Sequence, residues 1–149
     1  MSDADPLPAV LAAEGPVLPV VAGLVFRQGR LLISQRRPDD HLGGLWEFPG
    51  GKVESGEAPT EGLCRELREE LDVEVEVGDL IAEVAHAYPE RRVRIQFFRC
   101  RLLHGEPMPR HCAAVAWVTP AELDRYPFPA ADARLLERLR TEPGLWRDA

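Results

Sequence analysis

Residues 51–73 read GKVESGEAPTEGLCRELREELDV, and this stretch decides how the chain folds. Pro59 suits the first turn of a helix, because its fixed backbone angle fits there and its missing N–H is not needed. The apolar spacing carries that helix to about Leu71. One flank of the helix forms an apolar stripe that packs into a core, namely Leu63, Cys64, Leu67 and Leu71.

Three carboxylates lie beside that stripe, at Glu66, Glu69 and Glu70. At about 100° per residue they share one face of the helix, where like charges repel by roughly 0.2–0.5 kcal/mol per pair. A helix that gathers them needs a cation, and hard carboxylate oxygens favour Mg²⁺, with Mn²⁺ as the alternative. Because a glycine-rich turn at 49–51 stands just upstream, the pattern predicts a site for a metal-bound polyphosphate.

The same stretch resembles the Nudix box, G-x5-E-x7-R-E-U-x-E-E-x-G-U, in which U is apolar. Asp72 stands where the box has its last glycine, which is usually a helix C-cap, and aspartate tolerates the left-handed conformation needed there. The alternative is an ordinary surface helix with a solvated acidic face. The matches that argue against it are Gly51, Glu57, Arg65, Glu66, Leu67, Glu69, Glu70 and Val73.

The resemblance implies a hydrolase in which Glu66, Glu69 and Glu70 hold Mg²⁺ and one of them helps to deprotonate water. Arg65 lies four residues before Glu69, so it can pair with that carboxylate and orient it. Glu57 is the expected partner of Arg65 across the loop. A plain surface ion pair is the alternative for these two residues.

Two further metal ligands follow from the resemblance. In the family, the carbonyl of the residue before the box glycine touches metal, which here is Gly50. Many relatives add a glutamate from a later loop, and counting from Trp117 this position is His111. A neutral histidine can bind metal or accept a proton, but His111 can equally be an exposed loop residue. Glu106 is a nearby substitute.

Outside the box, the chain resembles the MutT-like subgroup at 35–37, 45–52, 88–91 and 126–132. This implies hydrolysis of a nucleoside triphosphate to monophosphate and pyrophosphate, as in nucleotide-pool sanitation and DNA repair. In that subgroup a polar residue at the position of Asp132 meets the base edge. An ionised aspartate only accepts hydrogen bonds, which suits 8-oxo-dGTP or CTP and dCTP. The competing interpretation makes Asp132 the N-cap of the last helix.

The other expected substrate contacts each have a plainer alternative. Arg36 and Arg91 match positions that touch sugar, phosphate or base, yet they can be surface residues. Phe48 or Trp46 can stack on a base or belong to the core, and only one of them is expected to face the cleft. Lys52 reaches phosphate or solvent. The substrate-binding set is then Arg36, Phe48, Gly51, Lys52, Arg91 and Asp132.

Two rival functions remain. One is hydrolysis of ADP-ribose or another nucleoside-diphosphate derivative, because Pro89 falls where ADP-ribose hydrolases of this family often have proline. The other is a non-catalytic nucleotide-sensing Nudix module. Such modules usually lose box carboxylates, and this chain keeps all of them.

Composition fits a small enzyme. The 149 residues predict a loose tail at 1–16 and one domain at 17–149. The net charge of −7 argues against polymeric nucleic acid as a partner. Three cysteines without a C-x-x-C pair, and an acidic N-terminus that is no secretory signal, predict a reduced, cytoplasmic protein. The sequence leaves open whether it is a monomer or a homodimer. The apolar run at 16–26 is too short to span a membrane.

The hydrophobic pattern predicts an α+β fold, and the resemblance implies a Nudix-type α/β/α sandwich with a mixed sheet between helices. A break in the long strand is expected near 78–79, and a capping box at 119–122 is expected to open a short helix. The expected strands are 17–26, 31–35, 45–48, 73–86, 92–103 and 115–118, and the expected helices are 59–71 and 132–140.

Overall fold

The computed structural model describes residues 16–89 and 91–148. The expected tail at 1–16 therefore lies, apart from residue 16, outside the described residues. Within these described ranges, single-turn 3-10 helices occupy 123–125, 130–132 and 143–145. The other elements are β1 (Val17–Arg27), β2 (Arg30–Gln35), β3 (Trp46–Glu47), β4 (Gly50–Lys52), α2 (Pro59–Leu71), β5 (Glu74–Tyr88), β6 (Arg91–His104), β7 (Ala114–Val118) and α3 (Ala133–Thr141).

The strands form a mixed sheet in the order β3-β2-β1-β6-β5, with β4 paired to β1 and β7 paired to β2. β1 runs parallel to β6 and antiparallel to β2 and β4. Residues 21–26 of β1 are all buried, as expected for a strand that is covered on both faces. β4 approaches β1 so closely that a Cβ atom at Gly50 would lie 1.9 Å from the carbonyl oxygen of Val21.

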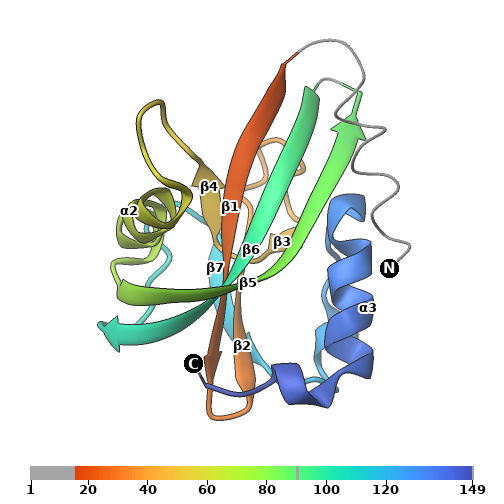
Figure 1. The fold of residues 1–149 in the computed structure, drawn as a ribbon. Helices are drawn as coiled ribbons and strands as arrows, with labels where there is room; N and C mark the ends of the chain where they lie inside the picture. Colours follow the sequence, from red (N-terminus) through yellow and green to blue (C-terminus); the bar gives the residue numbers. More distant parts are fainter. Residues whose placement is uncertain (1–15, 90, 149) are drawn as a thin grey trace.

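Helices α2 and α3 lie on opposite sides of the sheet (Figure 1). Leu63, Leu67 and Leu71 of α2 belong to one buried hydrophobic cluster. Leu135 and Leu139 of α3 belong to a second cluster on the other side. The structure thus confirms the predicted α+β class with a mixed sheet between helices.

Helix α2 begins and ends where the sequence predicts. Pro59 is its first residue and Leu71 its last. Asp72 has a φ of 61° and a ψ of 41°, the left-handed conformation expected of a residue that replaces the C-cap glycine, and its N–H donates to the carbonyl of Arg68. The helix therefore presents Glu66, Glu69 and Glu70 in the register that the spacing predicts.

The predicted break near 78–79 is wrong. β5 is continuous, and its pairing with β6 shifts register between Val77 and Leu80 and again between Leu80 and Ala82. Such irregularities absorb extra residues without ending a strand, so Gly78 marks a bulge and not a loop.

Two assignments also differ from the prediction. Only Trp46–Glu47 pairs as a strand within the expected 45–48, and the glycine turn expected at 49–51 is instead the start of strand β4 at Gly50. The box at 119–122 does open a short helix as predicted, a single 3-10 turn at Leu123–Arg125, and the Thr119 N–H donates to Glu122 at 2.9 Å.

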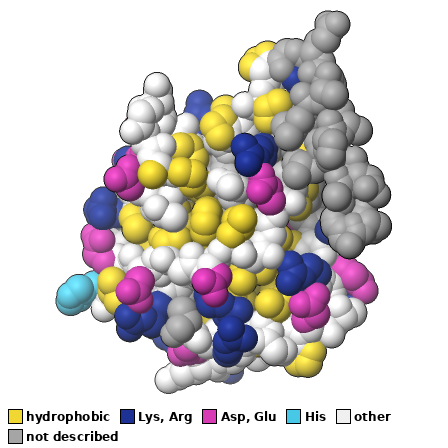
Figure 2. Space-filling view, in the orientation of Figure 1, with side chains coloured by type: hydrophobic (Ala, Val, Ile, Leu, Met, Phe, Trp, Pro, Cys, Tyr) yellow, Lys and Arg dark blue, Asp and Glu magenta, His cyan; other side chains and the backbone are white. Residues whose placement is uncertain are grey.

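The surface carries mixed charges. In Figure 2, acidic and basic side chains lie interspersed around hydrophobic side chains in the middle of the face shown. Cys64, Cys100 and Cys112 are all free thiols. Among the described helices, none has both the length and the apolar content needed to cross a membrane.

Candidate active site

A pocket of about 350 Å³ lies where β1, β4, β6 and α2 meet the loop after β2. Glu57, Arg65 and Glu69 do not line it; they lie beside it, on the helix and the loop before it. The predicted site residues that do line it are Arg36, Phe48, Gly50, Gly51, Lys52, Glu66, Glu70, Arg91, His111 and Asp132.

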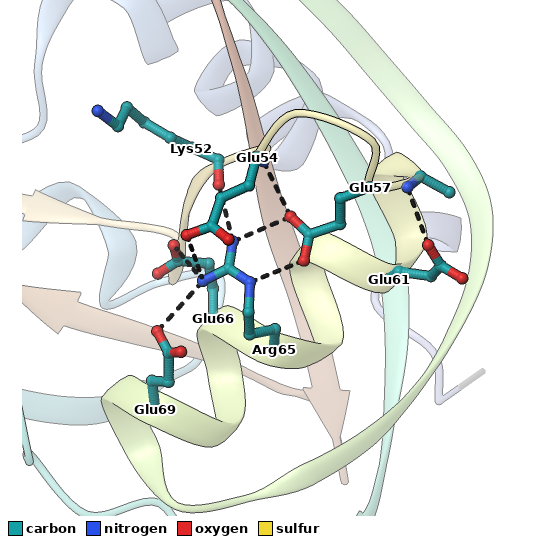
Figure 3. Close-up of polar contacts among 8 residues, drawn as sticks. Lys52, Glu54, Glu57, Glu61, Arg65, Glu66 and Glu69 are labelled. Atoms are coloured by element: carbon teal, nitrogen blue, oxygen red, sulfur yellow. Dashed lines mark hydrogen bonds and ion pairs between the residues drawn. The ribbon is translucent and has the colours of Figure 1, made fainter.

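The Arg65 guanidinium organises the acids next to the pocket (Figure 3). Its Nε and Nη2 donate to the two carboxylate oxygens of Glu57 at 2.7 and 3.0 Å, which confirms the predicted pair. Its Nη1 lies 3.2 Å from Glu66 and 3.2 Å from Glu69, and its Nη2 donates to the carbonyl of Lys52 at 3.0 Å. The hydrogen bonds from Arg65, then that from the Glu54 N–H, lower the pKa of Glu57 to about 2.

Gly51 leaves room for the Glu66 carboxylate. A Cβ atom at position 51 would lie only 2.4–2.6 Å from the carboxylate atoms of Glu66. The clash is with the far end of a flexible side chain, so the backbone would not have to move. A methyl group at 51 would instead push the carboxylate out of its place.

We therefore predict that Gly51→Ala folds normally but loses activity. Displacing Glu66 should lower kcat/KM by about tenfold, the lower range seen when a group around a metal site is disturbed. Steady-state hydrolysis and thermal unfolding measure the two effects. Gly144→Ala is the matched control, because nothing lies within 4 Å of a Cβ atom there. Full activity of Gly51→Ala would contradict the importance of the Glu66 position.

Three carboxyls in the pocket have raised pKa values, although Arg36 pairs with Glu47 and Arg65 with Glu66. Burial raises the pKa of Glu70 to about 9, with the charges of Glu47 and Glu66 adding to the effect. Burial also raises the pKa of Glu47 to about 7, although Arg36 opposes the shift. The pKa of Glu66 is raised as well, chiefly by burial. A cation bound among these carboxyls would stabilise their ionised forms and lower their pKa values.

Arg36 lines the pocket and is not a surface residue outside it. Its Nη2 lies 3.0 Å from Glu47, and its Nη1 donates to the carbonyl of His41 at 3.1 Å. Its Nε is buried and has no hydrogen-bond partner among the described residues. Arg91 and Lys52 are exposed at the pocket. The pocket thus combines buried acids with three cationic side chains.

Asp132 is the N-cap residue of α3, as the competing interpretation expected, but its side chain makes no cap hydrogen bond. The carboxyl is buried, with 6% exposed, and it lines the pocket. Burial, and then the charge of Glu47, raise the pKa of Asp132 to about 7. The side chain is therefore available to a ligand.

The aromatic residues form the wall of the pocket. Phe48 lines it, but one face of the ring stacks on Phe128 at 5.0 Å and its edge region meets Phe97 at 6.0 Å. Trp46 packs against Tyr126 and does not line the pocket. Only Phe48 of the two thus reaches the cleft. Strand alternation is not the reason, because residues 46 and 48 fall on the same face of a regular strand; β3 ends at Glu47, before Phe48.

The two candidates for the loop ligand, His111 and Glu106, differ in whether they line the pocket. Glu106 is ion-paired with Arg27 at 2.9 Å and does not line the pocket, so its role as a substitute is wrong. His111 is exposed and lines the pocket. The N–H groups of Arg110 and His111 point to the carbonyl of Glu70 at 3.0 and 3.4 Å, which places this loop against the end of α2.

Sequence reasoning missed Glu47 and the pair His41 and Tyr88. Glu47 is a charged residue inside an apolar strand segment, and that position was the available signal. The rings of His41 and Tyr88 meet edge to face at 5.4 Å, and both residues line the pocket. No local pattern relates these two, because they come from the loop after β2 and the end of β5.

No metal cage is preformed in the described part of the chain. There, no three His, Cys, Asp or Glu side chains are gathered around a point where an ion would sit. Glu66 and Glu69 instead share the Arg65 guanidinium. The donor set nevertheless fits a hard divalent cation, because it is made of carboxyl and carbonyl oxygens.

Fold and pocket together place the chain among α+β proteins whose acid-rich pocket lies between a helix and a short glycine-containing strand. The family model described as NUDIX domain matches residues 20–138, and the chain therefore belongs to the Nudix hydrolase family.

Relatives agree with this assignment. The CTP pyrophosphohydrolase of Escherichia coli (strain K12) is 37% identical over 121 residues, which cover 81% of this chain and 90% of that protein. A putative 8-oxo-dGTP diphosphatase 2 of Mycobacterium tuberculosis is 41% identical over 116 residues, 76% of this chain and 81% of that protein. The crystal structure of the MutT protein from Methanosarcina mazei Go1 superimposes with a TM-score of 0.77 at 26% identity, covering 88% of this chain and 98% of that one.

Proposed function

We propose that this protein is a Mg²⁺-dependent nucleoside triphosphate pyrophosphohydrolase that releases a nucleoside monophosphate and pyrophosphate. The observation that supports this most is the buried Asp132 carboxyl, which shares one pocket with Glu66 and Glu70 of the Nudix box. Such a substrate requires a polar group that binds the base and acidic groups that bind the metal on its polyphosphate. The relatives named for CTP and 8-oxo-dGTP make these two triphosphates, with dCTP, the leading substrates.

The metal would be held by Glu66, Glu69, Glu70 and the Gly50 carbonyl, with His111 as a further ligand. Mg²⁺ is the first choice and Mn²⁺ the second, because the other donors are hard oxygens. When bound, such an ion neutralises phosphate charge and lowers the pKa of water.

The side chains around the metal position have separate tasks. Arg65, itself held by Glu57, orients Glu66 and Glu69 through the hydrogen bonds at 3.2 Å. Arg36, Lys52 and Arg91 supply positive charge to phosphate and sugar.

Asp132 would read the base. Ionised, it accepts hydrogen bonds from guanine N1–H and N2–H₂ or from the cytosine amino group. A pKa of about 7 means that the protonated form, which can also donate, is accessible near neutral pH. Base preference of this site should therefore depend on pH.

We predict that Asp132→Asn folds normally and loses base selectivity. An amide keeps the volume but replaces one acceptor oxygen by a donor, so kcat/KM for the preferred triphosphate should fall by about tenfold, a typical penalty for an unsatisfied buried polar group. Steady-state kinetics with CTP and 8-oxo-dGTP measure the ratio. Asp124→Asn, at an exposed surface aspartate, is the control. An unchanged ratio would remove Asp132 from base recognition.

A hydrolysis screen tests the function as a whole. The panel contains normal and oxidised triphosphates, ADP-ribose and dinucleoside polyphosphates, each with and without Mg²⁺. Monophosphate and pyrophosphate are the expected products, and ¹⁸O-labelled water shows which phosphorus is attacked. Turnover of ADP-ribose alone would favour the rival hydrolase. Nucleotide binding without turnover would favour the sensing module.

A further inference from the structure

Arg99 of β6 is a buried cation without a buried anion. Only 4% of Arg99 is exposed to solvent, and burial lowers the pKa of its guanidinium. The charge of exposed Asp79 acts on Arg99, but no ion pair joins Arg99 to a carboxylate of the described residues, and its Nε has no hydrogen-bond partner there. Burying a charge is costly unless hydrogen bonds compensate. The contacts that Arg99 does make therefore indicate why it is there.

Those contacts go to the chain after α3. Arg99 Nη1 donates to the carbonyl oxygens of Leu145 at 3.0 Å and of Arg147 at 2.7 Å. The guanidinium also lies 5.0 Å from the ring centre of Phe26, a cation–π contact. Arg99 thus holds residues 143–148, which we call the C-terminal segment.

The C-terminal segment connects the sheet to α3. The Trp146 indole N–H donates to the carbonyl of Leu139 in α3 at 2.8 Å, and its ring meets Phe26 edge-on at 5.7 Å. Asp148 accepts the N–H of Gln28 from the β1–β2 turn at 3.0 Å. Loss of Arg99 would release the centre of this connection.

Helix α3 depends on such contacts for its position. It has nine residues, and isolated helices shorter than about 12–15 residues are marginal in water. Its fixed points are Leu135 and Leu139 in the core, Arg138 on the carbonyl of Ile81, and the C-terminal segment. Asp132 directly precedes the helix and is not tied down by a cap hydrogen bond.

We propose that Arg99 is a positioning residue for substrate selection, because by clamping the C-terminal segment it fixes α3 and so the Asp132 carboxyl in the pocket. The inference rests on the proposed role of Asp132. It assigns to a residue on β6, outside the pocket lining, an effect on substrate affinity and base preference but not on the chemical step.

The test uses Arg99→Met in the full chain, with CTP and 8-oxo-dGTP as probes. KM should rise roughly 2- to 30-fold, the range seen for residues that act through a coupled element, while kcat stays within about twofold. Amide hydrogen exchange over 133–141 should become faster in the metal-free protein. Arg101→Met is the matched control, because Arg101 lies two residues further along β6 and pairs with exposed Glu76 on the surface. Trp146→Phe, which removes the hydrogen bond to Leu139 but keeps a ring, should act in the same direction if Arg99→Met does not fold.

A double-mutant cycle with Asp132→Ala separates positioning from general destabilisation. If Arg99 acts through Asp132, Arg99→Met adds no further rise in KM once Asp132 is alanine. An equal rise with and without Asp132, or unchanged exchange in α3, would overturn the proposal. Asp132→Ala with unchanged KM and selectivity would instead refute the proposed base recognition, and the exchange data would still decide whether Arg99 holds α3.

Discussion

Glu70→Gln should lower kcat by about 10³-fold, the order of loss seen when a charge-stabilising group of a transition state is removed. Glu70 is buried in the pocket between Glu47 and Glu66, and the amide has the same shape but no negative charge to offer a cation. Hydrolysis of the best triphosphate from the screen, at saturating Mg²⁺, measures the effect. Glu76→Gln, at an exposed glutamate paired with Arg101, should leave kcat unchanged.

The same variant should be at least as stable as the parent protein without metal. The pKa of Glu70 is raised to about 9 by burial, so the folded chain holds a proton that the unfolded chain releases near its ordinary pKa of 4.5. The folded state binds more protons between these values, and the free energy of unfolding therefore falls as pH rises from about 4.5 to about 9. Glutamine has no proton to lose, so the Tm difference in favour of Glu70→Gln should widen with pH. A parent protein that gains stability over this range would contradict the burial of Glu70, and Mg²⁺ should reduce the difference at high pH by stabilising only the parent.

Arg65→Met should lower kcat/KM by about 100-fold, the upper range for residues that orient metal ligands. The guanidinium makes hydrogen bonds to Glu57, Glu66 and Glu69 at once, and no other cation among the described residues contacts all three. Its loss would leave three carboxylates facing one another, so Tm should fall too. Arg68→Met is the matched control, because Arg68 lies on the same helix but pairs with Glu74 on an exposed side. An equal loss of kcat/KM in the two variants would mean that Arg65 has no specific role in orienting Glu66 and Glu69.

The parts of this structure that sequence predicts are those set by local spacing. The limits of α2, the left-handed Asp72 and the Arg65–Glu57 pair all follow from residues within 23 positions of one another. Here helix geometry alone brings the side chains together.

Sequence predicts poorly where distant elements meet. Glu47 enters the pocket because a two-residue strand packs beside β2. Asp132 stands at the N-cap of α3, yet its carboxyl lines the pocket and makes no cap hydrogen bond. Sequence predicts a break in β5 where the structure has a bulge, because the strand continues only through its pairing with β6. Arg99 carries no pattern at all, since its acceptors lie more than forty residues away.

The glycines at 50 and 51 differ in whether a second mutation can rescue them. At Gly51 the obstacle is the Glu66 carboxylate, so a shorter acid at 66 can in principle accommodate a methyl group. At Gly50 the obstacle is the carbonyl of Val21, a backbone atom that every amino acid possesses. A second mutation can therefore restore a Gly51 variant. No second mutation can restore a Gly50 variant as long as β4 stays paired with β1.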